Sequence, residues 1–322
     1  RDWSSDVCSS DLYAAWARRS AGEAVAAQAS ERLSREDPDL SAASGVSRAQ
    51  IVTLAALGVT ATLAFCFAPL LWFALAQAFA VIMAAGVALR LLAVAETCLA
   101  APAAARPLRD SQLPVYTLVI PLYREAEVVE KLVAAIDRLD YPRARLDVKF
   151  VVEADDAATL RALEARDLSS WCEIIVAPPG FPRTKPRAMN VALPSARGTL
   201  LTVYDAEDEP EPDQLRLAAA RFAVVAPEVA CLQARLAIDN SGDSWLAALF
   251  AIEYAALFDV VNPGLAALDL PMPLGGTSNH FRVAALRDVH GWDAWNVTED
   301  ADLGVRLARF GYRTQEIGRA HV

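Results

Sequence analysis

The sequence contains few cysteines, and no two of them have C-x-x-C spacing. Of its five cysteines, Cys8 lies in a terminal segment considered separately below, and the others are scattered along the chain at Cys66, Cys98, Cys172 and Cys231. Isolated thiols give neither the ligand spacing of a structural zinc site nor the framework of a small disulfide-bonded protein. The sequence therefore indicates neither of these two classes.

Positive charge is also scarce. The chain has 30 Lys and Arg residues against 40 Asp and Glu residues, for a formal net charge of −10. A protein that binds nucleic acid needs a basic surface to pair with phosphate groups. We therefore expect no nucleic-acid partner.

Charge of either sign is absent from residues 51–89, and the apolar share of the whole chain is 55%. As one helix this stretch would be about 58 Å long, nearly twice the ~30 Å thickness of the hydrocarbon layer of a membrane. Two spans with a break near Ala68-Pro69 fit better, because proline disrupts a helix interior. The stretch is too long for a secretory signal. We expect two transmembrane helices within residues 51–98; the alternative is a buried helical hairpin in a soluble protein.

Arginine flanks this apolar stretch on both sides. Five arginines precede it and three follow it, and a two-span hairpin places both flanks on the same side of a membrane: Arg18, Arg19, Arg32, Arg35 and Arg48, then Arg90, Arg106 and Arg109. Loops rich in Lys and Arg remain in the cytoplasm. We therefore expect a cytoplasmic catalytic part and a multi-pass membrane protein.

The two ends of the chain match each other at the level of DNA. Residues 6–11 and residues 317–322 can be encoded by the two complementary strands of one short DNA sequence. Such ends resemble a sequencing adapter read at both edges of a fragment. We therefore expect residues 1–12 and 317–322 to be artefacts, and the natural protein to continue in both directions.

The remaining sequence divides into a helical or linker remnant at 13–50, a linker at 99–114 and a regular domain at 115–316. In this domain, strands predicted at 115–120, 148–152, 173–176 and 199–204 alternate with helices predicted at 125–139, 157–166 and 187–193. This alternation is typical of an α/β fold with a mostly parallel sheet and helices on both faces. The apolar stretch 245–261 is either a core helix or a helix at the membrane interface.

Polar clusters follow the predicted strands. Ligands of such sheets bind beyond the carboxyl ends of the strands, so four groups of residues are expected to converge there: Pro121 to Glu125, Glu153 to Asp156, Pro178 to Lys185, and Asp205 to Asp208. A carboxylate at the end of a buried strand is costly to leave unpaired. The convergence therefore indicates a site for a cation or a substrate.

The ordered set of motifs resembles family 2 glycosyltransferases of GT-A fold, in the membrane-bound, cellulose-synthase-like branch that includes bacterial exopolysaccharide synthases. The resemblance covers about 115–312 and rests on these segments: Val119-Ile120-Pro121-Leu122-Tyr123-Arg124-Glu125, Glu153-Ala154-Asp155-Asp156, Thr184 to Asn190, Asp205-Ala206-Glu207-Asp208, Gly275 to Arg282, and Gly291-Trp292 through Thr298-Glu299-Asp300-Ala301-Asp302.

The resemblance implies a nucleotide-sugar donor, usually UDP-linked. Asp155 or Asp156 would accept hydrogen bonds from the uracil or ribose, with Glu153 as the alternative, and Lys185 would lie beside the diphosphate. Asp205 resembles the metal-binding acidic motif for Mg²⁺ or Mn²⁺, with Glu207 or Asp208 as second ligand. The full set of donor-binding residues is then Pro121, Tyr123, Glu125, Glu153, Asp155, Asp156, Lys185 and Asp205.

The resemblance also implies a catalytic base and an acceptor site. Asp300, next to Glu299, matches the general base of an inverting transfer; alternatively, residues 298–300 form an ordinary helix N-terminus in which Thr298 is the cap. Acceptor-binding residues are expected at Gly276, Thr277, Asn279, His280 and Trp292. His280 could equally be a buried structural histidine, and Trp292 could equally belong to the core.

One motif of the processive members, Gln-x-x-Arg-Trp, is absent from this sequence. The expected function is transfer of sugar to a growing polysaccharide at the bacterial inner membrane, with a carbohydrate or lipid-linked acceptor and membrane lipid as partners. The alternatives are transfer of a single sugar to a polyprenyl phosphate or another lipid, and a non-catalytic membrane receptor or scaffold. Intact Lys185, Asp205 and Asp300 argue against the scaffold.

Overall fold

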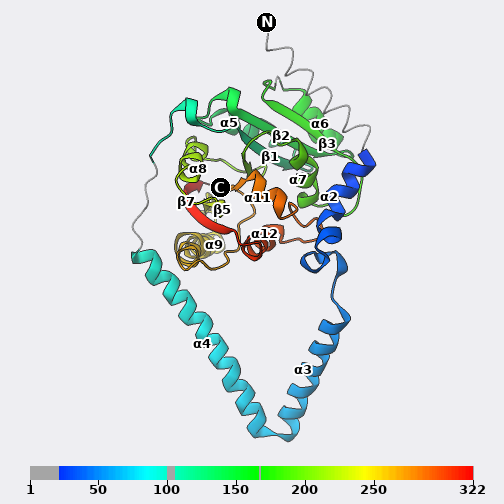
Figure 1. Ribbon diagram of the computed structural model, residues 1–322, viewed down its shortest axis with the longest axis vertical. Helices are drawn as coiled ribbons and strands as arrows, with labels where there is room; N and C mark the ends of the chain where they lie inside the picture. Colours follow the sequence, from blue (N-terminus) through cyan, green and yellow to red (C-terminus); the bar gives the residue numbers. More distant parts are fainter. Residues whose placement is uncertain (1–21, 100–105, 167, 322) are drawn as a thin grey trace.

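The computed structural model describes residues 22–99, 106–166 and 168–321. The described part consists of a hairpin of two long helices and a domain built on one sheet (Figure 1). Residues 1–12, predicted to be an artefact, lie outside the described residues, whereas the last strand of the sheet runs through residue 321.

The predicted break in the apolar stretch is present. Helix α3 (Arg48–Phe67) ends at Ala68, and helix α4 (Pro69–Leu99) begins at the proline. Ser47 and Gln50 form a capping box that fixes the start of α3. In Figure 1 the two helices leave the domain as a V whose tip lies at this break. Both are long and apolar enough to cross a membrane.

The sheet has seven strands in the order β3-β2-β1-β4-β6-β5-β7. The strands are β1 (Tyr116–Leu122), β2 (Leu146–Glu153), β3 (Cys172–Ala177), β4 (Leu200–Val203), β5 (Val229–Ala237), β6 (Asn279–Arg282) and β7 (Arg313–His321). All neighbouring pairs are parallel except those of β6, which is antiparallel to both β4 and β5. The predicted mostly parallel sheet is therefore confirmed, and the four predicted strands are β1 to β4.

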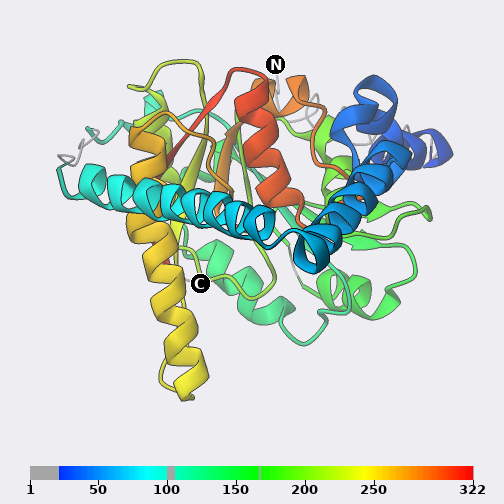
Figure 2. The same ribbon diagram turned by 90° about the horizontal axis from the view of Figure 1, so that it is seen from below.

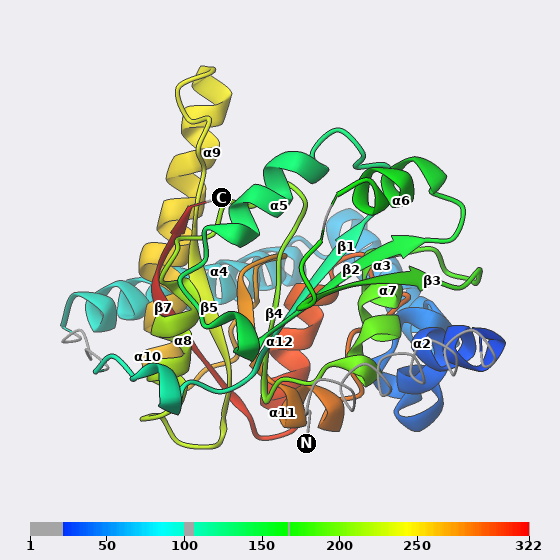
Figure 3. The same cartoon turned by 90° about the horizontal axis from the view of Figure 1, so that it is seen from above.

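Helices cover both faces of the sheet, as predicted. One face carries α5 (Val129–Asp137), α6 (Ala157–Glu164) and α8 (Gln214–Phe222), and the other carries α7 (Lys185–Ala192), α11 (Val283–Asp288) and α12 (Glu299–Arg309). Figure 3 shows α5 and α6 on one side of β1 to β3 and α7 on the other. Because side chains alternate along a strand, Leu118 and Ile120 of β1 belong to one core and Val119 to the other.

The segment before the hairpin packs on the domain. Helix α2 (Gly22–Glu36) lies against α7 and buries Ala26, Ala29 and Leu33. Two short 3₁₀ turns, η1 (Pro38–Leu40) and η2 (Ala42–Ser44), follow it and lead to α3. This part of the predicted linker is thus an ordered layer on the face that carries α7 and α12.

A third apolar helix lies beside the end of the hairpin. It comprises α9 (Trp245–Ala256), a π-helical turn η6 (Leu257–Val261) and α10 (Asn262–Ala267), and its length and composition also suit a membrane span. No residue of α9 is buried, which rules out the core-helix alternative. Figure 2, seen from the hairpin side, shows that α9 extends beyond the domain and that α4 passes across the domain.

The close contact between α4 and α10 requires a glycine. A Cβ atom at Gly264 would lie 2.2 Å from the carbonyl oxygen of Ala93, while a Cβ atom at Gly86 of α4 would meet nothing within 4 Å. We predict that Gly264→Ala lowers the free energy of unfolding by about 1–3 kcal/mol, the usual cost of overpacking. Thermal unfolding in detergent measures it.

Gly86→Ala is the matched control, since it adds the same methyl group to an apolar helix without a clash. It should leave stability unchanged or raise it slightly, because alanine is the better helix former. Equal melting temperatures for the two variants would contradict the predicted contact.

Candidate functional site

All four predicted polar clusters contribute to one pocket of about 360 Å³ at the carboxyl edge of the sheet, the cluster after β2 through Glu153 alone. The pocket is lined by the following residues: Pro121, Leu122, Tyr123, Glu125, Glu153, Arg183, Thr184, Lys185, Ala188, Asp205, Ala206 and Glu207. Six of the predicted donor-binding residues, Pro121, Tyr123, Glu125, Glu153, Lys185 and Asp205, are in this lining.

The centre of the pocket is an ion pair between Lys185 and Asp205. Lys185 is the first residue of α7, and Asp205 follows β4, so the two side chains come from adjoining elements at the same edge. The ammonium group of Lys185 also donates a hydrogen bond of 2.9 Å to the carbonyl oxygen of Gly276. Desolvation raises the pKa of Asp205, the Lys185 ammonium opposes this shift, and the nearby charges of Glu207 and Asp300 add to it.

Asp300 faces the same place from α12. A Cβ atom on Gly276 would lie 3.3 Å from Oδ2 of Asp300 and 3.9 Å from Nζ of Lys185. The missing side chain of Gly276 therefore leaves room between the predicted base and the ion pair. Lys185, Asp205 and Asp300 therefore face one space.

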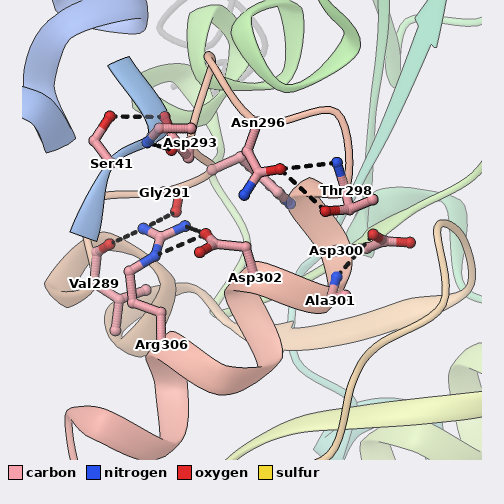
Figure 4. Close-up of polar contacts among 12 residues, drawn as sticks. Ser41, Val289, Gly291, Asp293, Asn296, Thr298, Asp300, Ala301, Asp302 and Arg306 are labelled. Atoms are coloured by element: carbon pink, nitrogen blue, oxygen red, sulfur yellow. Dashed lines mark hydrogen bonds and ion pairs between the residues drawn. The ribbon is translucent and has the colours of Figure 1, made fainter. Parts of the chain in front are cut away.

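Asp300, the predicted base, lies in the first turn of α12. Oδ1 of Asp300 accepts a hydrogen bond of 2.7 Å from the backbone N–H of Ala301, and its carboxylate points away from the Asp302–Arg306 ion pair (Figure 4). Thr298 occupies the cap position, but its side chain makes no cap bond and donates to Asn296 instead. Glu299 is buried, and desolvation raises the pKa of its carboxyl group.

The floor of the pocket is a buried ion pair. Both carboxylate oxygens of Glu153 lie 3.3 Å from Nη1 of Arg187, whose side chain is fully buried. Desolvation raises the pKa of Glu153, and the guanidinium of Arg187 opposes that shift. Glu153 therefore presents a partly neutralised acceptor at the end of β2.

The other two acids of that cluster differ from Glu153. Asp155 pairs with Arg183 at 2.7 Å, at the solvent-exposed rim of the pocket. Asp156 caps α6, accepting from the backbone N–H of Thr159 and from that of Arg124. The carboxylate of Asp156 is thus occupied by hydrogen bonds from backbone amides. Of the two aspartates, only Asp155 is connected to the pocket, by its ion pair with the lining residue Arg183.

Glu207 and Asp208, the two candidates for the second metal ligand, point in different directions. Glu207 lines the pocket. Asp208 is 2% exposed and accepts hydrogen bonds from the hydroxyl of Thr277 and, at 2.7 Å, from the backbone N–H of Asp205. Desolvation raises the pKa of Asp208 to about 7.

No group of three or more His, Cys, Asp or Glu side chains in the described ranges is arranged to hold a metal ion. Mg²⁺ and Mn²⁺ sites that also bind phosphate use only one or two carboxylates, with phosphate oxygens and water as the other ligands. Asp205 and Glu207 provide such a pair of hard oxygen donors on one wall of the pocket. The residues present therefore fit a cation shared with a bound diphosphate.

The predicted acceptor residues are mostly buried. Gly276 borders the pocket, whereas Thr277 is bonded to Asp208, and Asn279 donates to the carbonyl of Gly275. Trp292 packs edge-to-face on Phe281 in the core. Sequence reasoning missed Gln233, which accepts from the N–H of Gly275 and donates to the carbonyl of Thr277, so that it fixes the loop carrying Gly276.

His280 is also a core residue. It lies in β6, is fully buried, and has the hydroxyl of Tyr116 2.7 Å from its Nδ1. Desolvation lowers its pKa to about 3, so the folded protein keeps the imidazole neutral under conditions in which an unfolded chain would protonate it.

A pH dependence of stability follows. Below the unfolded-state pKa of about 6.5, only the unfolded chain gains a proton at His280, and the free energy of unfolding falls by up to about 1.4 kcal/mol per pH unit. His280→Gln lacks this contribution. We predict that the stability difference between the native protein and this variant shrinks between about pH 6.5 and pH 5, as measured by denaturant unfolding. A constant difference over that range would contradict the assignment of His280 as buried and neutral.

Comparison with known proteins gives three findings. The family model "Glycosyltransferase like family 2" matches residues 114–320. Among curated proteins, the probable glucomannan 4-beta-mannosyltransferase 1 of Arabidopsis thaliana is 28% identical over 211 residues, covering 62% of this chain and 37% of that protein. Glucomannan 4-beta-mannosyltransferase 2 of the same plant is 25% identical over 226 residues, covering 67% and 41%.

Among solved structures, a mannosyltransferase from Pyrobaculum calidifontis, in complex with GDP-Man and Mn²⁺, aligns with a TM-score of 0.55 at 22% identity. It covers 75% of this chain and 66% of that one. At this identity the likeness concerns the fold. The chain spans less than half the length of the curated relatives that it matches.

Proposed function

The chain belongs to glycosyltransferase family 2, and from this membership and the pocket we propose that it transfers a sugar from a nucleotide-diphosphate donor to an acceptor hydroxyl with inversion. The observation that carries the proposal is the convergence of Lys185, Asp205 and Asp300 around Gly276. In this arrangement the ammonium group of Lys185 can interact with a diphosphate, and the carboxylate of Asp300 faces the same small space as a base.

Asp300 takes the proton from the acceptor hydroxyl as that oxygen attacks the anomeric carbon of the donor sugar. The bond from this carbon to the diphosphate breaks at the same time, and the nucleoside diphosphate leaves from the opposite side. One displacement inverts the configuration, so an α-linked donor gives a β-linked product. Lys185 interacts with the diphosphate, and Glu153 and Asp155 accept hydrogen bonds from the nucleoside.

A bound Mg²⁺ or Mn²⁺ would be held by Asp205 and Glu207 together with donor phosphates, and it would offset charge on the departing diphosphate. Asp208 supports Asp205 from behind, because its carboxylate accepts from the Asp205 backbone N–H. We therefore choose Glu207 over Asp208 as the second ligand.

The donor has two candidates. The motifs resemble enzymes that use UDP-sugars, while the relatives' names and the solved mannosyltransferase with GDP-Man favour a mannosyl donor. The acceptor is a growing β-linked polysaccharide at the bacterial inner membrane. The hairpin of α3 and α4 anchors the domain in this membrane. Release of UDP or GDP from a panel of UDP-sugars and GDP-Man by the complete protein in vesicles decides the donor, and product size on a gel distinguishes a polymer from a single transfer.

The assignment of the base is tested by Asp300→Asn. We predict that kcat falls by about 10²–10⁴-fold, the usual contribution of a general base, while the KM for the donor changes little because Asp300 faces the acceptor. Nucleoside diphosphate release measures both constants. Asp288→Asn is the control, since Asp288 is an exposed acid that accepts from the hydroxyl of Tyr312 and does not line the pocket. Normal turnover by Asp300→Asn would overturn the proposed mechanism.

The choice of the second metal ligand is tested by Glu207→Gln and Asp208→Asn. We predict that Glu207→Gln raises the Mn²⁺ concentration for half-maximal activity by about tenfold or more. Asp208→Asn retains an acceptor for Thr277 and should shift that concentration by less than about threefold. The reverse order of the two variants would assign the ligand to Asp208.

A further inference from the structure

Residues 22–44, which we name the amino-terminal strap, touch the loop that leads into the helix of the proposed base. This loop, residues 291–298, is named the base loop and ends where α12 begins. The strap itself ends just before Ser47, the cap of the membrane helix α3. A short ordered path thus runs from the membrane hairpin to the base.

The strongest link in this path is Asp293 of the base loop. It is 1% exposed, and its two oxygens accept from the hydroxyl of Ser41 at 3.1 Å and from the backbone N–H of Ala42 at 2.6 Å (Figure 4). Oδ1 also accepts from the N–H of Trp295, two residues further along the same loop, at 3.1 Å. Asp293 therefore joins the strap to the loop backbone through one buried carboxylate.

Trp295 and Asn190 provide a second link between the strap and the base loop. The indole N–H of Trp295 donates to the carbonyl of Ser30 in α2 at 3.0 Å. The amide of Asn190 in α7 donates to both the carbonyl of Ala29 and that of Trp292, at 2.9 and 2.7 Å. The same helix α2 is thus tied to the base loop both directly and through α7.

The opposite side of the base loop faces the donor pocket. The hydroxyl of Thr184, next to Lys185, donates to the carbonyl of Ala294 at 2.7 Å. Arg306 donates to the carbonyl of Gly291 at 2.8 Å from within α12. The loop is thus held by the pocket wall on one side and by the strap on the other.

We infer that the amino-terminal strap positions the catalytic base, with Asp293 and Ser41 as positioning residues of the proposed transfer reaction. Asp293 fixes the base loop against the strap, and this contact sets the direction in which Asp300 enters the pocket. Neither residue touches the pocket itself, whose lining comes from other elements. The inference rests on the proposed function, and it predicts an effect on turnover without an effect on donor binding.

The test is a set of variants of the complete protein in vesicles, assayed by nucleoside diphosphate release. Ser41→Ala removes the hydrogen bond to Asp293 and also the one that the hydroxyl accepts from the backbone N–H of Ala43 within the strap. It should lower kcat by about three- to tenfold, the effect of the one hydrogen bond lost to the base loop, at an unchanged KM for the donor. Asp293→Asn should lower kcat further. Both carboxylate oxygens of Asp293 accept hydrogen bonds, and the NH2 group of asparagine would face one of these donors, in the strap or at Trp295, without being able to accept from it. Ser41→Thr keeps the hydroxyl and should restore turnover.

Ser34→Ala is the matched control. It removes a hydroxyl of the same strap that donates only to the carbonyl of Glu31 within α2, and it should leave kcat unchanged. The double variant of Ser41→Ala and Asp293→Ala should be no slower than Asp293→Ala alone, because alanine at position 293 has already removed the acceptor of the Ser41 hydroxyl. Equal loss in Ser41→Ala and Ser34→Ala, or multiplied losses in the double variant, would overturn the inference.

Hydrogen exchange provides a readout that does not require activity. Ser41→Ala should speed amide exchange in residues 291–301, and Ser34→Ala should not. Unchanged exchange there in Ser41→Ala would overturn the positioning role whatever the activity. Failure of the proposed function would look different, because the native protein would release no nucleoside diphosphate from any donor while the exchange difference persisted.

Discussion

The site depends on several carboxylates that lie close together at the carboxyl edge of the sheet. Burial raises the pKa of Asp205, and the nearby charges of Glu207 and Asp300 raise it further. Lys185 is the one group among the pocket-lining residues that pairs with Asp205, and it is fixed further by the carbonyl of Gly276. An excess of negative charge around a single ammonium suits a site that is completed by a cation and a sugar diphosphate.

The reversed strand β6 explains how Gly276 reaches that edge. In an all-parallel sheet, the segment before a strand would lie at the amino edge, far from Asp205. Because β6 runs against β4, its first residue Asn279 is paired with Val203, the last residue of β4. The loop before β6, which contains Gly275 and Gly276, therefore lies at the carboxyl edge, where α12 also begins.

Much of the fold could be predicted from the sequence because its signals are local. The alternation of apolar runs predicted β1 to β4 and the helices between them, and Pro69 marked the break between α3 and α4. The polar strand ends predicted the pocket, since parallel strands share one carboxyl edge. Asp205, Lys185 and Glu153 follow from this rule without any knowledge of distant contacts.

The remaining details depend on contacts between residues far apart in sequence. The ion pair of Asp155 with Arg183 at the rim has no local signal, whereas Asp156 directly precedes the predicted helix at 157–166, the position of a cap. His280 and Trp292 have the chemistry of ligand-binding residues, but β6 and the loop before α12 turn them into the core. Gln233 fixes the glycine loop from a neighbouring strand, and no pattern in its own segment points to that role.

The packing of α7 ties these parts into one unit. Its first residue Lys185 binds Asp205, its buried Arg187 pairs with Glu153, and its Asn190 joins α2 to the base loop. One short helix thus contacts the proposed phosphate side of the pocket, the proposed nucleoside side, and the loop before the proposed base. A shift of α7 would move all three together, so the donor site and the base are positioned by the same rigid element rather than by independent loops.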